Sequence, residues 1–465
     1  MSRRPAPPAI PARPPGRRTD SRRAGSDNVR AVAAWIVDRT LASRAPAESF
    51  LAGAADRFDE RDQRLLRELA YGTLRWLRRL DHVLERASER RLEEIQPELR
   101  TILRVAALQL LFLDRVPAHA AVSEAVDQAH LRSHRGGASF ANAVLRRIAR
   151  EPALGAWPVE ESDPIRRLAI EKSHPDALVA RWLARLGGAE TARLLDANNR
   201  PKPVHLLAFR DRGGRELLAE ELIDAGLEVE PCRLSPVGLT VREGNPFATA
   251  AFERGAFYVQ DEASQAAALL PPPRAGERIL DAAAAPGGKG LALLAFEPAI
   301  RLVSADVSLA RLATVAENGR RLARRLALVV ADAAAPPWAG RFDRVVLDAP
   351  CSGTGTLRKH PELKWRWSEA ELARLAGQAE RLLGACAAAV AVGGLLAYIT
   401  CSLEPEENEV VAARFLAVQP DFSPIDPAAG GEPPTRATPA EAGVWRLATG
   451  ADHDGFTVHV FRRAR

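Results

Sequence analysis

The stretch FDRVVLDAPCSGTGT, residues 342–356, decides the fold. Its first seven residues form an apolar β-type run that ends on Asp348, as expected for a buried parallel strand that brings polar groups to its carboxyl end. Cys351 then lies on the loop after the strand, where open α/β sheets place their ligands. Gly353 and Gly355 allow this loop to bend close to a ligand. The stretch therefore predicts an α/β sheet with a functional loop at one edge.

A second cysteine follows in the same kind of setting. The run GGLLAYITCS, residues 393–402, is another apolar strand, and Cys401 lies near its end. Because the carboxyl ends of parallel strands meet at one edge of a sheet, Cys351, Cys401 and Asp348 can converge on one pocket. Each cysteine taken alone could equally be a small residue of the buried core, so the surrounding motifs have to decide.

A loop of small residues precedes both cysteines in the sequence. In RILDAAAAPGGKG, residues 278–290, a strand leads into this loop and then into a helix that should begin at Gly287–Gly288. Small side chains let the backbone approach a ligand, and the helix N-terminus offers N–H groups to a carboxylate. The spacing matches neither G-x-G-x-x-G nor a Walker loop, which disfavours nicotinamide and ATP sites. The loop resembles the S-adenosylmethionine loop of class I methyltransferases.

Four aspartates close successive apolar strands in this half of the chain: Asp281, Asp306, Asp332 and Asp348. Asp306 follows at the spacing where an acid meets ribose hydroxyls in such sheets. Asp332 should lie beside the adenine. One such acid would be unremarkable, but four in the same position predict a binding edge.

Length and composition exclude several classes of protein. The 465 residues leave room for two or three domains, and 47% hydrophobic with 27% charged residues is typical of a soluble globular chain. No apolar run approaches the roughly 18 residues of a membrane span, and no signal-peptide pattern follows the start. We therefore expect a cytoplasmic protein with free thiols. Four scattered cysteines do not make a disulfide framework or a zinc site, so no metal is expected.

The charge balance favours an anionic partner only weakly. A net charge of +6 and a pI near 9.5 are typical of nucleic-acid-binding proteins. Nearly all the cations are arginines, however, and a biased composition would give the same excess. Residues 1–26 are rich in Arg and Pro, so we expect a disordered tail there.

Residues 27–150 have helical periodicity throughout, with apolar residues three and four positions apart. The run from Ile102 to Leu113 is apolar almost all round and should be the central helix. The segments YGTLRW, ILRVAALQLLFLDRVPAHAAVSEAV and FANAVLRRI resemble the NusB family of all-helical RNA-binding domains. By this resemblance, phosphate contacts are expected from Arg75, Arg78, Arg79, Arg146, Arg147 and Arg150.

A Pro- and Gly-containing linker, residues 151–163, separates this bundle from a connector. Residues 164–250 predict two helices followed by strands and turns, a small α+β subdomain. Asn199 and Arg200 in this connector are candidates for RNA contact, although the asparagine could instead cap a helix. The remaining residues, 251–465, should form a Rossmann-like catalytic domain.

The motifs DAAAAPGGK, DVSLARL, DAPCSGTGTLRKHPELKWRW and YITCSLEPEENE together closely resemble the RNA 5-methylcytosine methyltransferase family. With the NusB-like front end, the resemblance is strongest to its bacterial ribosomal RNA members of the RsmB/Sun type. It implies that S-adenosyl-L-methionine is the cofactor and small-subunit (16S) ribosomal RNA the partner. Ala283 and Gly290 depart from the family pattern, in which a cysteine and a hydroxyl residue are common at these positions.

The resemblance also implies a mechanism. Cytosine C5 is a poor nucleophile, and a thiolate that adds to C6 makes C5 enamine-like. In this family the nucleophile corresponds to Cys401, whereas Cys351 assists release and Asp348 assists at N3. The expected cofactor-binding residues are Ala283, Ala284, Ala285, Pro286, Gly287, Gly288, Lys289, Asp306, Arg311, Asp332 and Asp348.

Three other functions remain open at this point. A DNA cytosine-5 methyltransferase would use Cys351 as its nucleophile, but the Cys401 motif and the NusB-like bundle disfavour it. A noncatalytic RNA-binding or antitermination protein would not need the intact set of Asp348, Cys351 and Cys401. An RNA cytosine-5 methyltransferase that acts on tRNA or another RNA is the strongest alternative. We expect a monomer that does not bind membranes.

Overall fold

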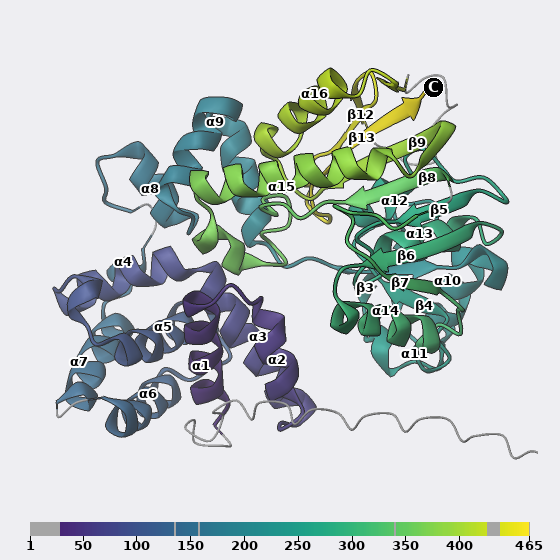
Figure 1. Cartoon of the computed structure of the whole chain (residues 1–465). Helices are drawn as coiled ribbons and strands as arrows, with labels where there is room; N and C mark the ends of the chain where they lie inside the picture. The colour runs from purple at the N-terminus through teal and green to yellow at the C-terminus, as the bar shows by residue number, and fades with distance from the viewer. Residues whose placement is uncertain (1–27, 134–135, 157–158, 339–340, 426–437, 465) are drawn as a thin grey trace, which may run out of the picture. The chain divides into compact units, whose positions relative to one another are not determined.

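The computed structural model of the chain describes residues 28–133, 136–156, 159–338, 341–425 and 438–464 (Figure 1). The predicted tail at residues 1–26 lies outside the described residues. The chain divides into two compact units, residues 1–160 and 161–465. In the part of the chain that the structure describes, no helix is both long and apolar enough to cross a membrane.

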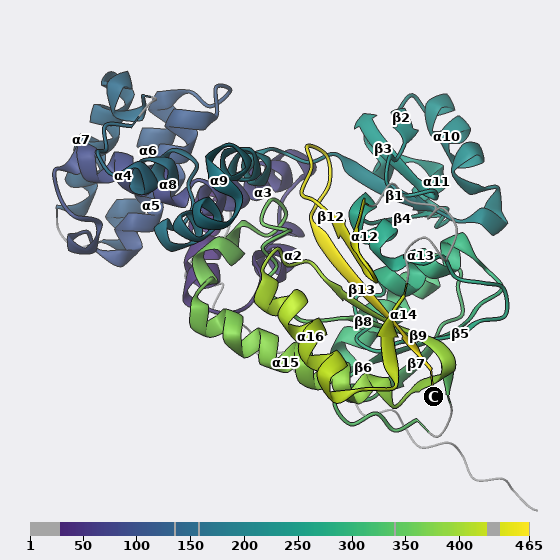
Figure 2. The same cartoon turned by 90° about the horizontal axis from the view of Figure 1, so that it is seen from above.

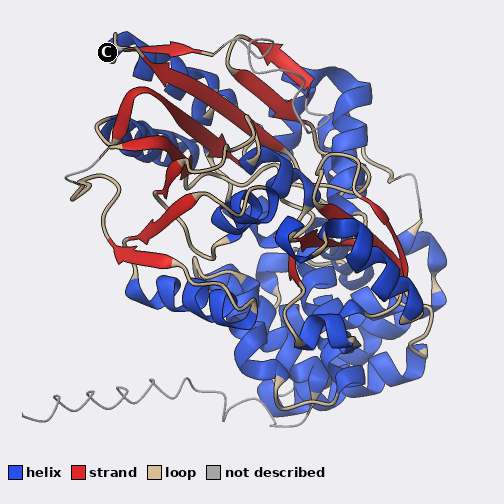
Figure 3. Ribbon diagram, turned by 90° about the vertical axis from the view of Figure 1, so that its right-hand side faces the viewer, coloured by secondary structure: helices blue, strands red, loops and turns tan. Residues whose placement is uncertain are grey.

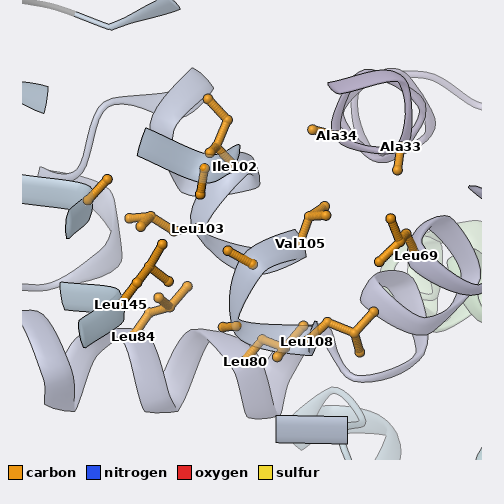
Figure 4. Close-up of a cluster of buried hydrophobic side chains, with 14 of the residues drawn as sticks. Ala33, Ala34, Leu69, Leu80, Leu84, Ile102, Leu103, Val105, Leu108 and Leu145 are labelled. Atoms are coloured by element: carbon orange, nitrogen blue, oxygen red, sulfur yellow. The ribbon is translucent and has the colours of Figure 1, made fainter. Parts of the chain in front are cut away.

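The described part of the first unit is all-helical, as predicted. Its α-helices are α1 (Val29–Ala42), α2 (Ala47–Ala55), α3 (Glu60–Arg75), α4 (Leu77–Ser88), α5 (Pro97–Phe112), α6 (Ala118–Arg132) and α7 (Gly137–Arg150). Helix α5 contacts α1, α3, α4, α6 and α7, which confirms it as the central helix. Figure 4 shows Leu103, Val105 and Leu108 of α5 among side chains from the surrounding helices.

Local chemistry explains where these helices begin and break. The side chains of Asn28 and Asp59 accept backbone hydrogen bonds at the starts of α1 and α3, as N-cap residues do. The helical periodicity runs on without interruption past Trp76, but the helix breaks there into α3 and α4. The ring of Trp76 stacks on Phe112 of α5 with centroids 4.7 Å apart. Tertiary packing accompanies a break that periodicity alone does not predict.

The second unit begins with two helices and a small antiparallel sheet. Its elements are α8 (Pro164–Glu171), α9 (Asp176–Asn199), β1 (Val204–Ala208), α10 (Gly214–Asp224), β2 (Glu228–Pro231), β3 (Gly238–Glu243), α11 (Ala250–Glu253) and β4 (Phe257–Val259). The strand order is β2-β3-β1-β4, and every pairing is antiparallel. Strand β4 lies beyond residue 250, where the catalytic domain was expected to begin, but its hydrogen bonds join it to β1 of this small sheet.

A larger mixed sheet carries the predicted chemistry. Its elements are α12 (Glu262–Ala268), β5 (Arg278–Asp281), α13 (Gly288–Phe296), β6 (Arg301–Asp306), α14 (Leu309–Arg321), β7 (Ala327–Val330), β8 (Phe342–Asp348), α15 (Glu369–Ala387), β9 (Val390–Thr400), α16 (Glu409–Val418), β10 (Phe422–Pro424), β11 (Thr438–Glu441), β12 (Val444–Leu447) and β13 (Phe456–Arg463). The order is β11-β12-β13-β9-β8-β5-β6-β7, and β10 pairs with β13. Figures 2 and 3 show the long strands side by side with helices packed around them.

Strands β9, β8, β5, β6 and β7 are parallel, so their carboxyl ends share one edge. The chain runs from β5 to β6 on one side and later returns to β8 on the other. This reversal of strand order opens a crevice at the carboxyl ends of β5 and β8, the usual ligand position in open α/β sheets. The predicted α/β fold is confirmed, and the switch point lies between Asp281 and Asp348.

Candidate active site

The predicted aspartates lie at the shared edge. Asp281, Asp306 and Asp348 are the last residues of β5, β6 and β8, and Asp332 lies two residues beyond the end of β7. Asp281 and Asp306 are buried, Asp348 is partly buried and Asp332 is exposed. The four aspartates therefore lie along one edge of the sheet, as the strand pattern in the sequence predicts.

The small-residue loop after β5 is tightly held by backbone hydrogen bonds. Ala282 N–H donates to Val346 O at 2.9 Å and Ala284 N–H donates to Ala305 O at 2.8 Å. Gly287 has φ +106°, in the left-handed region, and a Cβ on Gly290 would lie 2.9 Å from Leu302. The Thr or Ser that is usual at position 290 would thus require Leu302 to move. The neighbours of Gly290 therefore fit a residue without a side chain.

The start of α13 offers hydrogen-bond donors beside this loop. Gly290 N–H donates to Asp281 Oδ2 at 3.1 Å, and Leu291 N–H donates to Gly287 O. Within the described ranges, no acceptor is recorded for the N–H groups of Gly288 and Lys289. These donors and the cradle of small residues fit the carboxylate end of an S-adenosylmethionine-type cofactor.

Asp281 is the most deeply buried acid of this edge. Its Oδ1 has no hydrogen-bond partner in the described structure. Burial, followed by the charge of Asp348, raises the pKa of Asp281 to about 7 even though Lys289 opposes the shift. At neutral pH this carboxyl group is therefore poised between its two protonation states.

Asp306 holds the turn that follows β6. Its Oδ1 accepts from Ser308 N–H at 3.0 Å, and its Oδ2 accepts from Ala285 N–H at 3.3 Å. Arg311 lies 3.4 Å from Oδ2 and also donates to Ala285 O at 3.0 Å. Asp306 and Arg311 thus connect the ends of β5 and β6. Among the described residues, Asp332 Oδ1 accepts only from its own turn, at Ala334 N–H.

Lys289 lies beside the proposed catalytic acid. Its ammonium donates to Asp348 Oδ2 at 2.9 Å and to Ser264 Oγ at 3.0 Å. It also lies over the ring of Phe456, 4.7 Å from the centroid. Lys289 is 7% exposed and Asp348 34% exposed, so the pair is shielded but still reachable from the crevice.

The structure brings the two motif cysteines together. Cys351 Sγ and Cys401 Sγ are 3.4 Å apart, and both side chains are only partly buried. The hydrogen bond with Cys401, and then burial, raise the pKa of Cys351 well above its ordinary value. The other cysteines, Cys232 and Cys386, are buried, so they fit the core interpretation.

Two residues of the segment after Cys401, for which the sequence predicted no role, hold the cysteine loops. Glu407 accepts from Ser352 N–H at 2.7 Å and from Ser352 Oγ at 2.6 Å. Asn408 accepts from Thr400 Oγ1 and donates to Ser402 O at 3.0 Å. Burial raises the pKa of Glu407 despite its bonds to Ser352. These two residues therefore position the loops on either side of the cysteines.

Glu404 connects the same segment to the connector helix α9. Its side chain is fully buried and accepts from Arg181 at 2.6 Å, Trp182 at 3.0 Å and Arg185 at 3.2 Å. A buried carboxylate with three donors from one helix is a strong anchor. The motif quoted for the family thus includes a structural contact whose partners lie more than two hundred residues away.

Basic groups border the cysteine loops. Lys202 donates to Asp261 Oδ2 at 2.8 Å and to Asp454 Oδ2 at 3.0 Å, and these carboxylates outweigh burial to raise the pKa of Lys202. The side chain of Lys359 is exposed, and loss of water to nearby protein atoms, followed by the charge of Lys202, lowers its pKa. No acceptor for the Lys359 ammonium is recorded in the described ranges.

One of the expected RNA contacts is wrong. Arg79 is 1% exposed and donates to the carbonyl oxygens of Gly155 and Ala156, so it is a structural residue of the first unit. Asn199 is partly exposed, donates to Lys172 O at 2.6 Å and accepts from Lys364 at 2.8 Å, and its contact with RNA stays a prediction. Long polar side chains near helix ends satisfy backbone carbonyls as readily as phosphates, and sequence alone does not distinguish the two.

Models of three families match the chain. The NusB family matches residues 27–150, the ferredoxin-like domain of RsmF/B-like methyltransferases matches residues 174–248, and the 16S rRNA methyltransferase RsmB/F family matches residues 267–457. A ribosomal RNA small subunit methyltransferase B from Pseudomonas syringae pv. tomato is 35% identical over 435 residues, which cover 92% of this chain and 95% of that protein. This chain belongs to the RsmB/F family.

Other relatives agree with RsmB/F membership. A probable ribosomal RNA small subunit methyltransferase B from Bacillus subtilis is 33% identical, covering 80% of this chain and 83% of that protein. The crystal structure of PH0851 superposes with a TM-score of 0.76 at 26% identity, covering 94% of this chain and 99% of that one. The RsmB/F chain is thus an rRNA methyltransferase with a NusB domain, as its motifs predicted.

No group of three or more potential metal ligands occurs among its described residues.

Proposed function

We propose that this enzyme transfers a methyl group from S-adenosyl-L-methionine to C5 of one cytosine in 16S ribosomal RNA. The observation that carries the proposal is the pair of cysteine sulfurs 3.4 Å apart, next to the Lys289–Asp348 ion pair. Family membership supports the methyl donor and the RNA class. The arrangement of the two thiols and the carboxylate supports C5 of cytosine as the methylated atom. We propose further that the enzyme acts in the cytoplasm as a monomer.

The family resemblance assigns the attacking role to Cys401, and the contact between the two thiols supports a shared site. The raised pKa of Cys351 keeps it a thiol at neutral pH, so it can donate a hydrogen bond to Cys401. In the proposed mechanism Cys401 attacks, and its Sγ forms the bond to C6 while the electron pair of the C5–C6 double bond moves toward N3.

Asp348 assists this addition at N3. Negative charge develops there as the thiolate attacks, and the protonated form of Asp348 would give its proton to N3. The ammonium of Lys289, 2.9 Å away, would stabilise the carboxylate that remains. When bound, S-adenosylmethionine supplies the electrophilic methyl group that C5 accepts. A base then removes the C5 proton, Asp348 takes back the proton from N3 as the C6–S bond breaks, and Cys401 leaves as a thiolate with the assistance of Cys351.

The proposed cofactor site combines the small-residue loop and the strand ends. Backbone N–H groups at Gly288 and Lys289 would bind the carboxylate of the cofactor, and Asp306 would accept from the ribose hydroxyls. Asp332, exposed beyond β7, would border the adenine. The remaining predicted residues, Ala283 to Gly287 and Arg311, would shape the loop and keep it close to the ligand.

The test is a methylation assay with tritium-labelled S-adenosylmethionine on small-subunit ribosomal RNA and on tRNA. Bisulfite sequencing of the product then locates 5-methylcytosine, and RNA from a deletion strain should lack the same mark. Label in ribosomal RNA at one bisulfite-resistant cytosine is the expected result. Label only in tRNA, or at an atom other than C5, would contradict the proposal.

A further inference from the structure

A half-open cavity of about 680 Å³ lies beside the cysteine loops in the second unit. It is bounded by the carboxyl-terminal half of α9, the segment after Cys401, and the turn between β12 and β13. Leu194, Leu403, Leu447 and Phe456 give it an apolar interior. A volume of this size falls within the ordinary range of small-ligand pockets, about 300–1,000 Å³.

Charged side chains at its rim are mostly neutralised by protein partners. Arg193 pairs with Glu190, Arg446 pairs with Glu409, and Arg185 donates to Glu404 at 3.2 Å. The rim carboxylate of Asp196 lies 2.6 Å from Lys172.

The exception on this rim is Arg200, which directly follows α9. Its side chain is exposed, and no acceptor for its guanidinium is recorded in the described part of the chain. The cavity thus combines an apolar interior with one available cation at its edge.

The cavity shares walls with the candidate active site. Leu403 is two residues beyond Cys401, and Phe456 lies beneath the ammonium of Lys289. Arg358 donates to the carbonyl oxygens of Ala197, Gly450 and Ala451, all of which line the cavity. The next residue, Lys359, borders the cysteine loops. A strand of RNA with its target base in the active site would therefore have an adjacent nucleotide near this opening.

We propose that the cavity binds the base of the nucleotide next to the target cytosine, with a backbone phosphate on Arg200. The inference rests on the proposed function. Proteins that read unpaired RNA bind bases against apolar and aromatic surfaces and bind phosphates with arginine. An apolar interior with one cation that has no recorded acceptor among the described residues matches a base joined to a phosphate. It would also hold the RNA strand in the splayed-out form that exposes the target base.

The test combines cavity variants with modified RNA. The substrate is a synthetic fragment around the methylated cytosine, either unmodified or carrying an abasic residue at the 5′ or the 3′ neighbour. Ala448→Trp fills the cavity from its exposed lining, and Arg200→Ala removes the rim cation. Matched controls are Ala370→Trp on the exposed face of α15 and Arg301→Ala at the opposite, amino-terminal end of β6.

For the wild type, one of the two abasic fragments should lower kcat/KM by about 5- to 100-fold, the loss expected when one stacked base is removed. Ala448→Trp should lose a similar factor on unmodified RNA and lose nothing further on the abasic fragment. Arg200→Ala should raise KM and reduce the slope of log Kd against log salt by about 0.7, the value for one phosphate contact on a single strand. Both control variants should behave as wild type, and calorimetry should show unchanged S-adenosylmethionine affinity for all four.

The inference is overturned if neither abasic fragment affects the wild type, or if Ala448→Trp keeps full activity on unmodified RNA. If Ala448→Trp fails to fold, Arg200→Ala with wild-type KM and salt slope overturns it instead. A wild type that methylates no RNA at all contradicts the proposed function itself. Cavity variants that methylate normally contradict only the cavity assignment and leave a free metabolite as the remaining occupant.

Discussion

The sulfur atoms of Cys351 and Cys401 lie 3.4 Å apart although the two residues are fifty positions apart in the chain. At this distance the two thiols cannot ionise independently, because a thiolate on one raises the pKa of the other. The pair is therefore suited to hold one negative charge at a time. In the proposed mechanism, one cysteine of the pair would attack while the other stays protonated.

Separate alanine substitutions should distinguish the two roles. Cys401→Ala removes the proposed nucleophile, so methylation and the protein–RNA adduct should both be lost. Cys351→Ala should still attack and transfer the methyl group, but release should stall and a denaturant-resistant complex should accumulate. Denaturing gels of each variant with substrate RNA and S-adenosylmethionine provide the measurement.

The opposite pattern of adducts would reverse the cysteine roles. An adduct that persists in Cys401→Ala and disappears in Cys351→Ala would make Cys351 the nucleophile, as in DNA cytosine-5 methyltransferases. Buried Cys386→Ala serves as the control, since its side chain packs in the core and should affect neither readout.

Substitution of Asp306 should weaken cofactor binding more than RNA binding. Its buried carboxylate holds the turn at Ser308 and, in the proposed site, accepts from ribose hydroxyls. Loss of hydrogen bonds to a charged acceptor costs about 1.5–3 kcal/mol, so Asp306→Ala should raise the Kd of S-adenosylmethionine by roughly 10- to 150-fold. Calorimetry that finds an unchanged Kd would remove Asp306 from the site. Exposed Asp343→Asn, at the far end of β8, is the control.

The first unit should fold by itself and bind RNA without catalysis. Its helices form their own core, and a fragment of residues 28–160 keeps the carbonyl acceptors of Arg79 at Gly155 and Ala156. A fragment that ends at residue 150 loses both acceptors and should be less stable by about 1.5–3 kcal/mol. Thermal unfolding compares the two fragments, and RNA titration at several salt concentrations measures binding. A 28–160 fragment that stays unfolded, or that shows no salt-dependent affinity, would argue against an independent RNA-binding unit.

The free energy of unfolding of the enzyme should depend on pH through the protonation of Asp281. Its pKa of about 7 in the folded state exceeds its ordinary value of 3.8, so between these pH values the folded state binds more protons than the unfolded chain. The free energy of unfolding due to this group therefore falls as pH rises through that window, by about 1.4 kcal/mol per pH unit, and levels off above pH 7.

Asp281→Asn should remove this dependence. Asparagine cannot ionise, and its oxygen can still accept from Gly290 N–H. The variant should therefore gain stability relative to wild type between pH 5 and pH 7.5 in urea unfolding. A stability difference that stays constant across this range would show that Asp281 titrates normally.

The strands and their terminal residues were predictable because they depend on local pattern. The apolar run ending at Asp348 corresponds residue for residue to β8, and parallel topology then brings Cys351 and Cys401 to one edge. Contacts between distant segments were not predictable in this way. The sequence gives no sign that Glu404 and Glu407 are buried, yet both are fully buried because their partners lie on α9 and in the Cys351 loop.

The anchoring of Glu404 by Arg181, Trp182 and Arg185 limits how this enzyme can be divided. A chimera joined at residue 251 would take the loop after Cys401 from one parent and α9 from another. The buried carboxylate of Glu404 would then face a helix that did not evolve with it. Exchange of parts between relatives should succeed instead near residue 160, where the two compact units divide. The connector and the catalytic sheet should therefore be inherited together, whereas the helical first unit can be exchanged separately.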